Sequence, residues 1–415
     1  MSSTSLSDLG PRAKAAARSL ATLSSSAKDE ALLLAADRLA DRSEEILSAN
    51  ALDVTRCLAE GASPTTVDRL RLSEARVALM ADGLRSVAAL PDPVGEVVEG
   101  FVRPNGLRVQ RVRVPLGVVG IIYENRPNVT ADAAALCLKS GNAVLLRGSA
   151  GALESNRVIA SLLRQAIGKA GLPADAVALV EDTSHETAVE FVRLRGVIDC
   201  LIPRGGPALL SMIVEHATVP YVLDGDGNCH VYVDAAADLS MAERIVVNAK
   251  LQRPSVCNAV ETLLVHRDVS DEFLPLIGRA LEGVVFAADE RSRPLLPGAR
   301  SATEADFATE FLALELAVGV VDDLDAAILH ISRYGSGHSE AIVTSDLEAA
   351  TRFVREVDAA AVLVNASTRF IDGGELGLGA EVGISTQKLH ARGPMGLREL
   401  TCVKYVVYGE GQVRE

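Results

Sequence analysis

The stretch VVGIIYENRPNVTADAAALCLKSGNAVLL, residues 118–146, decides the fold class of this chain. It opens with an apolar run over 118–123, continues as a helical pattern over 131–139 that Gly141 closes, and ends in a second apolar run over 143–146. Continuous apolar runs joined by a helix are typical of parallel strands buried on both faces of a sheet. The stretch therefore predicts a βα unit of a doubly wound α/β fold.

The same alternation extends along the rest of the chain. The first ninety residues have a helical pattern, and a long helix is expected over 153–169. Further strands are expected in two sets, at 177–180, 197–202 and 219–223, and then, from near Val231, at 262–266, 316–321, 341–343 and 361–364. Two sets of strands separated by helices predict two Rossmann-like doubly wound domains.

Two segments depart from this pattern. Residues 101–114 alternate apolar and polar side chains around Asn105-Gly106, which predicts a projecting hairpin with a two-residue turn. Exposed strand edges are protected most simply by pairing with another subunit, so we expect a homo-oligomer. Residues 372–395 are Gly-rich and polar, and a long loop of this kind inside a compact chain is usually functional.

The amino-acid composition limits the kinds of molecule that the protein is expected to bind. A formal net charge of −14 disfavours binding to nucleic acid, because phosphate backbones attract an excess of Lys and Arg. No apolar run reaches the roughly 18–20 residues that cross a membrane, and the N-terminus lacks a secretory signal pattern. The cysteines are scattered without a CxxC pair. We therefore expect a reduced, cytoplasmic protein.

Cys257 is the candidate nucleophile. Isolated cysteines are usually small buried hydrophobic residues, but three features favour a reactive thiol here. Pro254 marks an irregular connection between a helix and the strand expected at 262, and such connections often display catalytic side chains. Lys250 and Arg253 are near in sequence and can lower the thiol pKa from its usual value of about 8.5. Asn258 can help to position the reacting group.

Two Gly-containing turns after predicted strands are candidate phosphate sites. They are Arg147-Gly148-Ser149 and Arg204-Gly205-Gly206, and backbone N–H groups at such strand–helix junctions can bind a phosphate. A glycine after a strand is more often only a turn, and neither site has the GxGxxG pattern. Two turns that each carry an arginine nevertheless favour a phosphorylated cofactor, and arginine in place of an acidic residue favours NADP over NAD.

The polar segment 123–128 ends the first strand, at the edge of the sheet where such folds bind ligands. Arg126 or Asn128 can donate to a developing oxyanion there, although an ordinary polar loop has the same composition. Other chemistries are disfavoured, since Cys229, His230 and His266 fit no zinc-site spacing and no G-x-S-x-G elbow of a serine hydrolase occurs.

Several segments together resemble one enzyme family. They are YENRPNVT (123–130), LKSGN (138–142), NAKLQRPSVCN (248–258), VNASTRF (364–370) and GLGAEVGISTQKLHARGPMG (377–396). The match runs over nearly the whole chain, and the last segment is long and specific. On these motifs the chain resembles the γ-glutamyl phosphate reductases of the aldehyde dehydrogenase superfamily.

The resemblance implies an aldehyde-dehydrogenase-like α/β architecture. Residues 1–230 are expected to form the cofactor-binding domain, with a projecting oligomerisation hairpin at about 97–114. Residues 231–370 are expected to form the catalytic domain with Cys257, and residues 371–415 a Gly-rich active-site segment followed by a C-terminal oligomerisation strand.

Site residues follow from the same resemblance. Cys257 maps onto the family nucleophile, Arg147 onto a basic residue beside the adenosine ribose or its phosphate, and Arg126 near the oxyanion-stabilising Asn of the superfamily, with Asn128 as the alternative. The other expected cofactor contacts are Gly148, Ser149, Arg204, Gly205, Gly206 and Glu315. Many relatives carry Glu-Thr-Gly where this chain has Leu223-Asp224-Gly225, and loss of that hydrolytic base is consistent with reduction of a thioester.

The implied activity is NADPH-dependent reduction of L-glutamate 5-phosphate to L-glutamate 5-semialdehyde, with release of phosphate, in proline biosynthesis. It would proceed through a thioester on Cys257, with Arg253, Asn258, Arg369 and Lys388 binding the substrate. The labile acyl phosphate makes channelling from glutamate 5-kinase plausible. Two alternatives stay open: a dehydrogenase for another aldehyde or an acyl-CoA, and a nucleotide-binding scaffold without chemistry.

Overall fold

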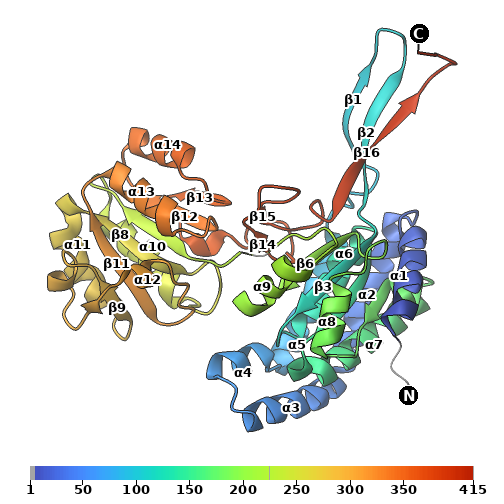
Figure 1. Cartoon of the computed structure of the whole chain (residues 1–415), viewed down its shortest axis with the longest axis horizontal. Coiled ribbons are helices and arrows are strands. Elements are labelled where there is room, and N and C mark those ends of the chain that lie inside the picture. The colour runs from blue at the N-terminus through green and yellow to red at the C-terminus, as the bar shows by residue number, and fades with distance from the viewer. Residues whose placement is uncertain (1–4, 224, 415) are drawn as a thin grey trace. The chain divides into compact units, whose positions relative to one another are not determined.

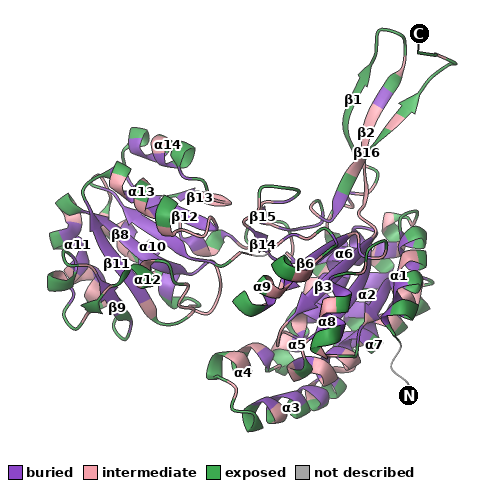
Figure 2. Ribbon diagram, viewed as in Figure 1, coloured by how far each residue is buried: buried purple, intermediate pink, exposed green. Residues whose placement is uncertain are grey.

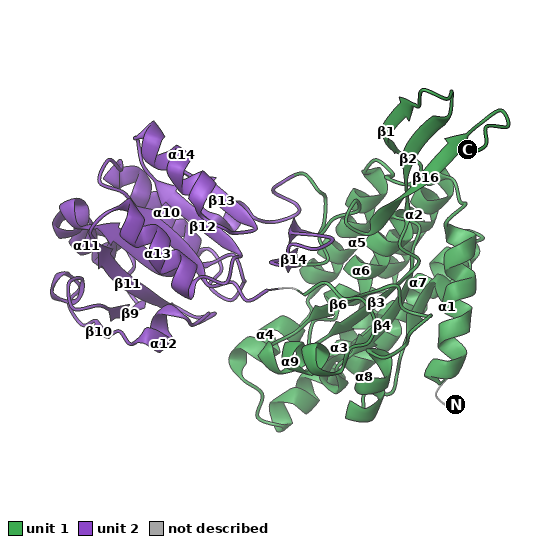
Figure 3. Ribbon diagram, turned by 45° about the horizontal axis from the view of Figure 1, so that its top comes forward, with its two compact units in different colours: residues 1–223, 377–383, 395–415 green, residues 224–376, 384–394 purple. Residues whose placement is uncertain are grey.

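The computed structural model describes residues 5–223 and 225–414 and divides the chain into two units (Figure 3). Unit 1 comprises residues 1–223, 377–383 and 395–415, and unit 2 comprises residues 224–376 and 384–394. The Gly-rich C-terminal part, expected as one segment over 371–415, is thus shared between the two units. Each unit contains its own parallel sheet, as the two sets of predicted strands required.

Unit 1 is built on a four-stranded parallel sheet in the order β5-β4-β3-β6. Figure 1 labels β3 and β6 of this sheet. The strands are β3 (Val118–Tyr123), β4 (Ala143–Gly148), β5 (Val177–Leu179) and β6 (Cys200–Arg204). All residues of β3 and β4 are buried, which explains their apolar sequences. In Figure 2 the buried residues are purple, as along β3. The βα unit predicted from residues 118–146 is confirmed.

The strand predicted at 219–223 is wrong. Only Tyr221 makes a bridge, a parallel one to Leu201 of β6. Pro220 accepts a hydrogen bond from the Leu201 N–H through its carbonyl but has no N–H of its own to continue a ladder. The segment therefore follows the sheet edge without becoming a regular strand.

Helices form most of the first ninety residues, as expected. They are α1 (Leu6–Leu20), α2 (Ser25–Asp41), α3 (Ser43–Ala59), α4 (Pro64–Leu70) and α5 (Glu74–Ala89). Between and after the strands lie α6 (Asn128–Lys139), η1 (Ala150–Ala152), α7 (Leu153–Lys169), η2 (Ala174–Ala176), α8 (His185–Phe191) and α9 (Pro207–His216). Helices α1, α6 and α7 contact the sheet directly, and α2 packs on α5 and α7.

Unit 2 contains a seven-stranded parallel sheet in the order β10-β9-β11-β8-β7-β12-β13. Its strands are β7 (Cys229–Val233), β8 (Val260–His266), β9 (Val285–Ala288), β10 (Arg300–Ser301), β11 (Glu315–Val321), β12 (Ser339–Val343) and β13 (Ala361–Val364). The helical elements are α10 (Leu239–Leu251), α11 (Arg267–Ala280), η3 (Arg293–Leu295), α12 (Glu304–Phe307), α13 (Leu324–Tyr334), α14 (Leu347–Glu356) and η4 (Thr368–Phe370). Because the strands are parallel, they all begin at one edge of the sheet.

A separate antiparallel sheet in unit 1 has the order β1-β2-β16. It joins the predicted hairpin, β1 (Val97–Val102) and β2 (Arg108–Pro115), to β16 (Thr401–Tyr408). All six residues of β1 are exposed. In unit 2 a short ribbon pairs β14 (Ile384–Ser385) with β15 (Gly393–Pro394). Among the described helices, none combines the length and apolar character that a bilayer span requires.

The hairpin turn differs from the predicted two-residue form. Val102 pairs with Arg108, and the Gly106 N–H donates to the carbonyl oxygen of Arg103 (2.9 Å). Only Gly106 of the turn has a positive φ, of 88°. A two-residue Asn-Gly turn needs a positive φ at Asn105 as well, whereas the observed turn places Pro104 at the position where its fixed negative φ fits.

Candidate active site

Cys257 lies in an irregular turn of unit 2, between α10, which ends at Leu251, and β8, which begins at Val260. The predicted position of this residue between a helix and a strand is confirmed. Its side chain is half-buried, whereas Cys402 is exposed and the other cysteines are buried. The turn places the thiol at the edge of the sheet where the strands begin.

The backbone around Cys257 is held by contacts from other segments. Cys229, the first residue of β7, donates from Sγ to the carbonyl oxygen of Cys257 (3.1 Å). Gly227 lies against the same carbonyl, since a Cβ at this position would be 1.7 Å from its oxygen. Thr368 Oγ1 donates to the carbonyl oxygen of Asn258 (2.7 Å). These contacts fix the peptide units that carry the candidate nucleophile.

Asn258 ties this turn to the start of the Gly-rich segment. Its Nδ2 donates to the carbonyl oxygen of Ile371 (2.8 Å), and the side chain is buried. Its Oδ1 has no hydrogen-bond partner within the described part of the chain. One of the two amide N–H bonds is therefore engaged in holding the turn, and the oxygen is left for a further contact.

Arg369 lies within electrostatic range of both the Cys257 thiol and Arg253. Arg369, in η4, donates from Nε to Gln252 Oε1 (2.7 Å). Burial lowers the pKa of Arg369; the charges of Asp372 and Cys257 act against this change, and that of Arg253 adds to it. The two arginines therefore lie within electrostatic range of each other, and Arg369 also within range of Cys257, where a phosphate group would reduce their mutual repulsion.

Lys250, expected from the sequence to lower the pKa of the Cys257 thiol, is paired with another group instead. Its Nζ donates to Glu261 Oε2 (2.6 Å) and to the carbonyl oxygen of Val260 (2.9 Å), and both charged side chains are fully buried. Burial raises the pKa of Glu261 to about 7 and lowers that of Lys250, while the pairing opposes both changes. The ammonium group thus joins the end of α10 to the start of β8.

Lys388 lies away from the nucleophile turn along the sequence, in the 386–392 segment of unit 2. Its Nζ pairs with Asp358 Oδ2 (2.5 Å), and Arg392 Nη1 pairs with Oδ1 of the same carboxylate (2.8 Å). All three side chains line one cavity of unit 2. Lys388 is therefore grouped with Arg392 and Asp358.

Arg147, at the end of β4, lies where unit 1 is expected to bind a nucleotide. Its Nη2 donates to the carbonyl oxygens of Thr183 (2.7 Å) and Ser184 (2.8 Å). Burial lowers its pKa, and the carboxylates of Asp182 and Glu124 oppose that change. Its buried Nε has no partner among the described residues. A buried guanidinium with a spare donor fits the phosphate or ribose of a dinucleotide cofactor.

The two residues after Arg147 shape this turn. A Cβ at Gly148 would be 2.2 Å from Asn156 Nδ2, so any side chain at this position would have to displace Asn156. Ser149 Oγ donates to Asn125 Oδ1 (3.0 Å) and accepts from the Asn125 N–H (3.1 Å). Ser149 therefore joins the ends of β4 and β3.

The second predicted phosphate turn is occupied by a carboxylate of the chain itself. Gly206 caps α9, and its N–H donates to Glu124 Oε2 (3.0 Å). A Cβ at Gly205 would lie 2.7 Å from the same oxygen. The Gly206 N–H, predicted to meet a phosphate, is thus bonded to Glu124, because a carboxylate suits the positive end of a helix as a phosphate does. Arg204, at the end of β6, is half-buried.

Asn128 and Arg126, the candidate oxyanion donors, lie at the start of α6. Asn128 Nδ2 donates to Asp132 Oδ2 (2.9 Å), which engages one of its two amide N–H bonds. Burial raises the pKa of Asp132 to about 6, while the hydrogen bond from Asn128 and the charge of Arg204 oppose this change. Arg126 precedes the helix in an irregular, half-buried segment.

Glu315, the remaining cofactor candidate, begins β11 in unit 2. Its Oε1 accepts hydrogen bonds from Arg300 Nε (3.2 Å) and Nη2 (2.5 Å). Arg300 also pairs with Asp306. The Glu315 carboxylate is thus hydrogen-bonded to, and ion-paired with, the guanidinium of Arg300.

Comparison with known proteins agrees with this arrangement. The aldehyde dehydrogenase family model matches residues 4–294. The chain is 57% identical over 409 residues to the γ-glutamyl phosphate reductase of Carboxydothermus hydrogenoformans, covering 98% of this chain and 99% of that protein. The crystal structure of the γ-glutamyl phosphate reductase of Thermotoga maritima has a TM-score of 0.95 and 47% identity, covering 99% of this chain and 100% of that one. The chain belongs to the aldehyde dehydrogenase family, in its γ-glutamyl phosphate reductase branch.

A more distant structure agrees in fold. The acetylating aldehyde dehydrogenase of Geobacillus thermoglucosidasius has a TM-score of 0.71 at 18% identity, covering 99% of this chain and 97% of that one. The family resemblance and the aldehyde-dehydrogenase-like fold predicted from the sequence are both confirmed.

Within this family member, sequence reasoning missed the residues that support the nucleophile. Cys229 and His230 were considered only as metal ligands. In the structure the Cys229 thiol donates a hydrogen bond to the carbonyl oxygen of Cys257 and lies 3.6 Å from His338 Nδ1, while His230 Nδ1 pairs with Glu340 (2.9 Å). The glycine at 227, just before a strand, was the available signal for a close backbone approach. Asp224, which replaces the hydrolytic Glu of relatives, lies outside the described residues.

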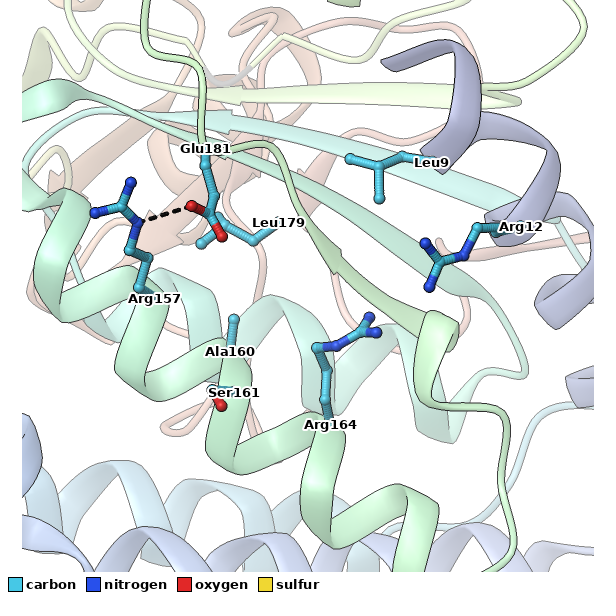
Figure 4. A pocket seen from close by; sticks show the side chains of 8 residues that line it. All are labelled: Leu9, Arg12, Arg157, Ala160, Ser161, Arg164, Leu179 and Glu181. Atoms are coloured by element: carbon cyan, nitrogen blue, oxygen red, sulfur yellow. Dashed lines mark hydrogen bonds and ion pairs between the residues drawn. The ribbon is translucent and has the colours of Figure 1, made fainter. Parts of the chain in front are cut away.

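A cavity of about 270 Å³ in unit 1 contains none of the predicted site residues (Figure 4). Arg12 of α1 and Arg164 of α7 face the same space there, and both pair with Asp175. Arg157 pairs with Glu181. Each arginine of this cluster therefore already has a carboxylate partner.

Proposed function

We propose that this protein reduces L-glutamate 5-phosphate to L-glutamate 5-semialdehyde in proline biosynthesis, with NADPH as the reductant. The single observation that supports the chemistry is the half-buried thiol of Cys257 on a backbone held by Cys229 and Gly227. The names of the closely similar relatives supply the substrate class.

The first step is attack of the Cys257 thiolate on the γ-acyl carbon. The C–O bond to phosphate breaks, and the phosphate leaves without needing a proton because it is already a stable anion. Arg369, whose charge interacts with Cys257, and Arg253, whose charge interacts with Arg369, are the residues that would hold the phosphate. The product of this step is a thioester on Cys257.

The second step converts the thioester to the aldehyde. The nicotinamide cofactor, when bound, supplies the hydride. Arg147 would hold the ribose or a phosphate of the cofactor, next to Gly148 and Ser149. The turn 204–206 and Glu315 are the other proposed cofactor contacts. Collapse of the hemithioacetal then returns the thiolate of Cys257 and releases the aldehyde.

Both steps develop negative charge on the acyl oxygen. Arg126 is proposed as the donor, with the second amide N–H of Asn128 as the alternative, since Asp132 engages the first. Loss of one such donor typically costs about 3 kcal/mol of transition-state stabilisation. Substrate contacts are proposed for Arg253, Arg369, Lys388 and Asn258. The absence of a hydrolytic Glu suits an enzyme whose thioester must meet hydride rather than water.

The residues proposed to bind the nucleotide belong to unit 1, except Glu315, and the nucleophile belongs to unit 2. The protein is proposed to be cytoplasmic. The exposed strand β1, with Phe101 and Val102 on its surface, is proposed to pair with another copy of the chain. Direct transfer of the labile acyl phosphate from a glutamate 5-kinase belongs to the same proposal.

The reverse reaction tests the proposal. The protein should reduce NADP⁺ with L-glutamate 5-semialdehyde only when phosphate is present, and should not act on simple aldehydes or acyl-CoA. Cys257→Ser should lower the rate by about 10³-fold or more, whereas Cys402→Ser, at an exposed thiol of β16, should leave it unchanged. Near-full activity of Cys257→Ser would sink the scheme.

A further inference from the structure

Unit 2 contains a cavity of about 330 Å³, and of its lining residues the proposed function gives a role only to Lys388. Its walls come from α13, the loop after it, β12, the end of α14 and the segment 386–392. The volume is at the lower end of the range of small-molecule sites. The ligand must therefore be small.

One wall of this cavity carries a buried carboxylate with an unused oxygen. Glu340 is fully buried, and its Oε2 accepts from the backbone N–H of His230 (2.9 Å) and pairs with His230 Nδ1 (2.9 Å). Its Oε1 has no hydrogen-bond partner among the described residues. An unbonded buried carboxylate oxygen is costly. A cationic donor in the cavity would remove that cost.

The cavity also carries an excess of positive donors. Lys388 and Arg392 share the two oxygens of Asp358, one oxygen each, so the three side chains have one net positive charge. An ammonium group has three N–H bonds and a guanidinium five, and the pairs with Asp358 use one of each. The buried Nε of Arg392 has no partner within the described residues. These donors suit a carboxylate.

Glu356, the remaining acidic residue that lines the cavity, is paired with arginines of its own helix and is not available to a ligand. Glu356 accepts hydrogen bonds from Arg352 and Arg355 on the outside of α14. Glu340 and the pair Lys388–Arg392 are thus the groups with capacity left for a ligand. One binds a cation and the other an anion.

We propose that this cavity binds the head of an α-amino acid, with its carboxylate at Lys388 and Arg392 and its ammonium at Glu340. The head has two sources: the γ-glutamyl substrate, in which case the inference rests on the proposed function, or a free amino acid that acts as an effector. The cavity lies at the start of β12 and Cys257 just before β8, with β7 between them. Two strand spacings are about 10 Å, and this is the separation that the γ-glutamyl substrate would have to span. A free amino acid bound as an effector has no such requirement.

Calorimetric titration of the full-length protein tests the assignment of charges. L-glutamate should bind, whereas glutarate, which lacks the ammonium, and 4-aminobutyrate, which lacks the α-carboxylate, should bind at least tenfold more weakly. Arg392→Gln should weaken L-glutamate binding at least tenfold, and Glu340→Gln should do so without changing the affinity for glutarate. Arg291→Gln, at an exposed ion pair of unit 2, is the matched control.

Two results would overturn the proposal: no binding of L-glutamate to the parent protein, or equal affinity of the parent and both cavity variants for it. Unfolding midpoints measured for each variant separate loss of the site from loss of the fold, and the conservative Glu340→Gln keeps the His230 hydrogen bond.

Alkylation of Cys257 by iodoacetamide distinguishes the two sources. Protection of the thiol by saturating L-glutamate would assign the cavity to the substrate head, and an unchanged alkylation rate would assign it to a separate effector. Phosphate-dependent NADP⁺ reduction is measured separately. Its absence alongside intact L-glutamate binding would overturn the proposed activity and leave the amino-acid site standing.

Discussion

Replacing Lys250 with methionine should destabilise unit 2 strongly. The substitution keeps most of the volume of the side chain but leaves Glu261 in a fully buried position without its partner, and the carbonyl oxygen of Val260 without a donor. Removing one member of a buried ion pair costs about 3–5 kcal/mol. Since a whole domain is stable by only about 5–15 kcal/mol, the loss should be plain in denaturant unfolding.

Far-ultraviolet circular dichroism during urea unfolding is the assay, because the chain has no tryptophan to report by fluorescence. The double variant Lys250→Met/Glu261→Gln should recover most of the loss, since a neutral amide is cheaper to bury and its oxygen still accepts from the Leu312 N–H. Arg333→Gln, at an exposed pair with Glu304, should cost less than about 1 kcal/mol. A cost of under about 1 kcal/mol for Lys250→Met would refute the reasoning.

Three further substitutions test the site. Gly227→Ala should slow both catalysis and alkylation of Cys257 by at least tenfold, because the new Cβ would displace the Cys257 carbonyl; Gly168→Ala, in open space on α7, should change neither rate. The pKa of Asp132 is raised to about 6, so the folded state binds this proton more tightly than the unfolded state, and the stability of unit 1 should fall as pH rises from about 4 to 6. Asp132→Asn should remove this fall. Unfolding curves of the variant that match those of the parent over this pH range would contradict the prediction. Arg147→Gln should raise KM for NADPH at least tenfold while changing KM for NADH less, and equal changes in steady-state kinetics would remove Arg147 from recognition of the 2′-phosphate.

The fold could be predicted because its strands are buried on both faces. The runs at 118–123 and 143–146 are apolar throughout, so their pattern needed no knowledge of the rest of the chain. The hairpin was predicted for a similar local reason, but its turn was not, because Pro104 outweighs the preference of Asn105-Gly106 for a two-residue turn.

The details of the site depend on contacts between distant segments and could not be predicted. Lys250 is seven positions before Cys257, yet it sits on a helix whose direction carries its ammonium to Glu261. The carboxylate at Gly206 comes from Glu124, 82 positions earlier. Neither pairing has a signature in the local sequence, because each arises only when strands and helices pack.

The pairing of β16 with β2 has a consequence for synthesis of the chain. Arg113 and Thr401, which meet in this sheet, are 288 residues apart. At a translation rate of about 5–20 residues per second, β2 waits roughly 15–60 s for its second neighbour. During that time one edge of the hairpin is open to any extended segment nearby. The charged side chains of β2, Arg108, Arg111 and Arg113, disfavour such pairing until β16 arrives.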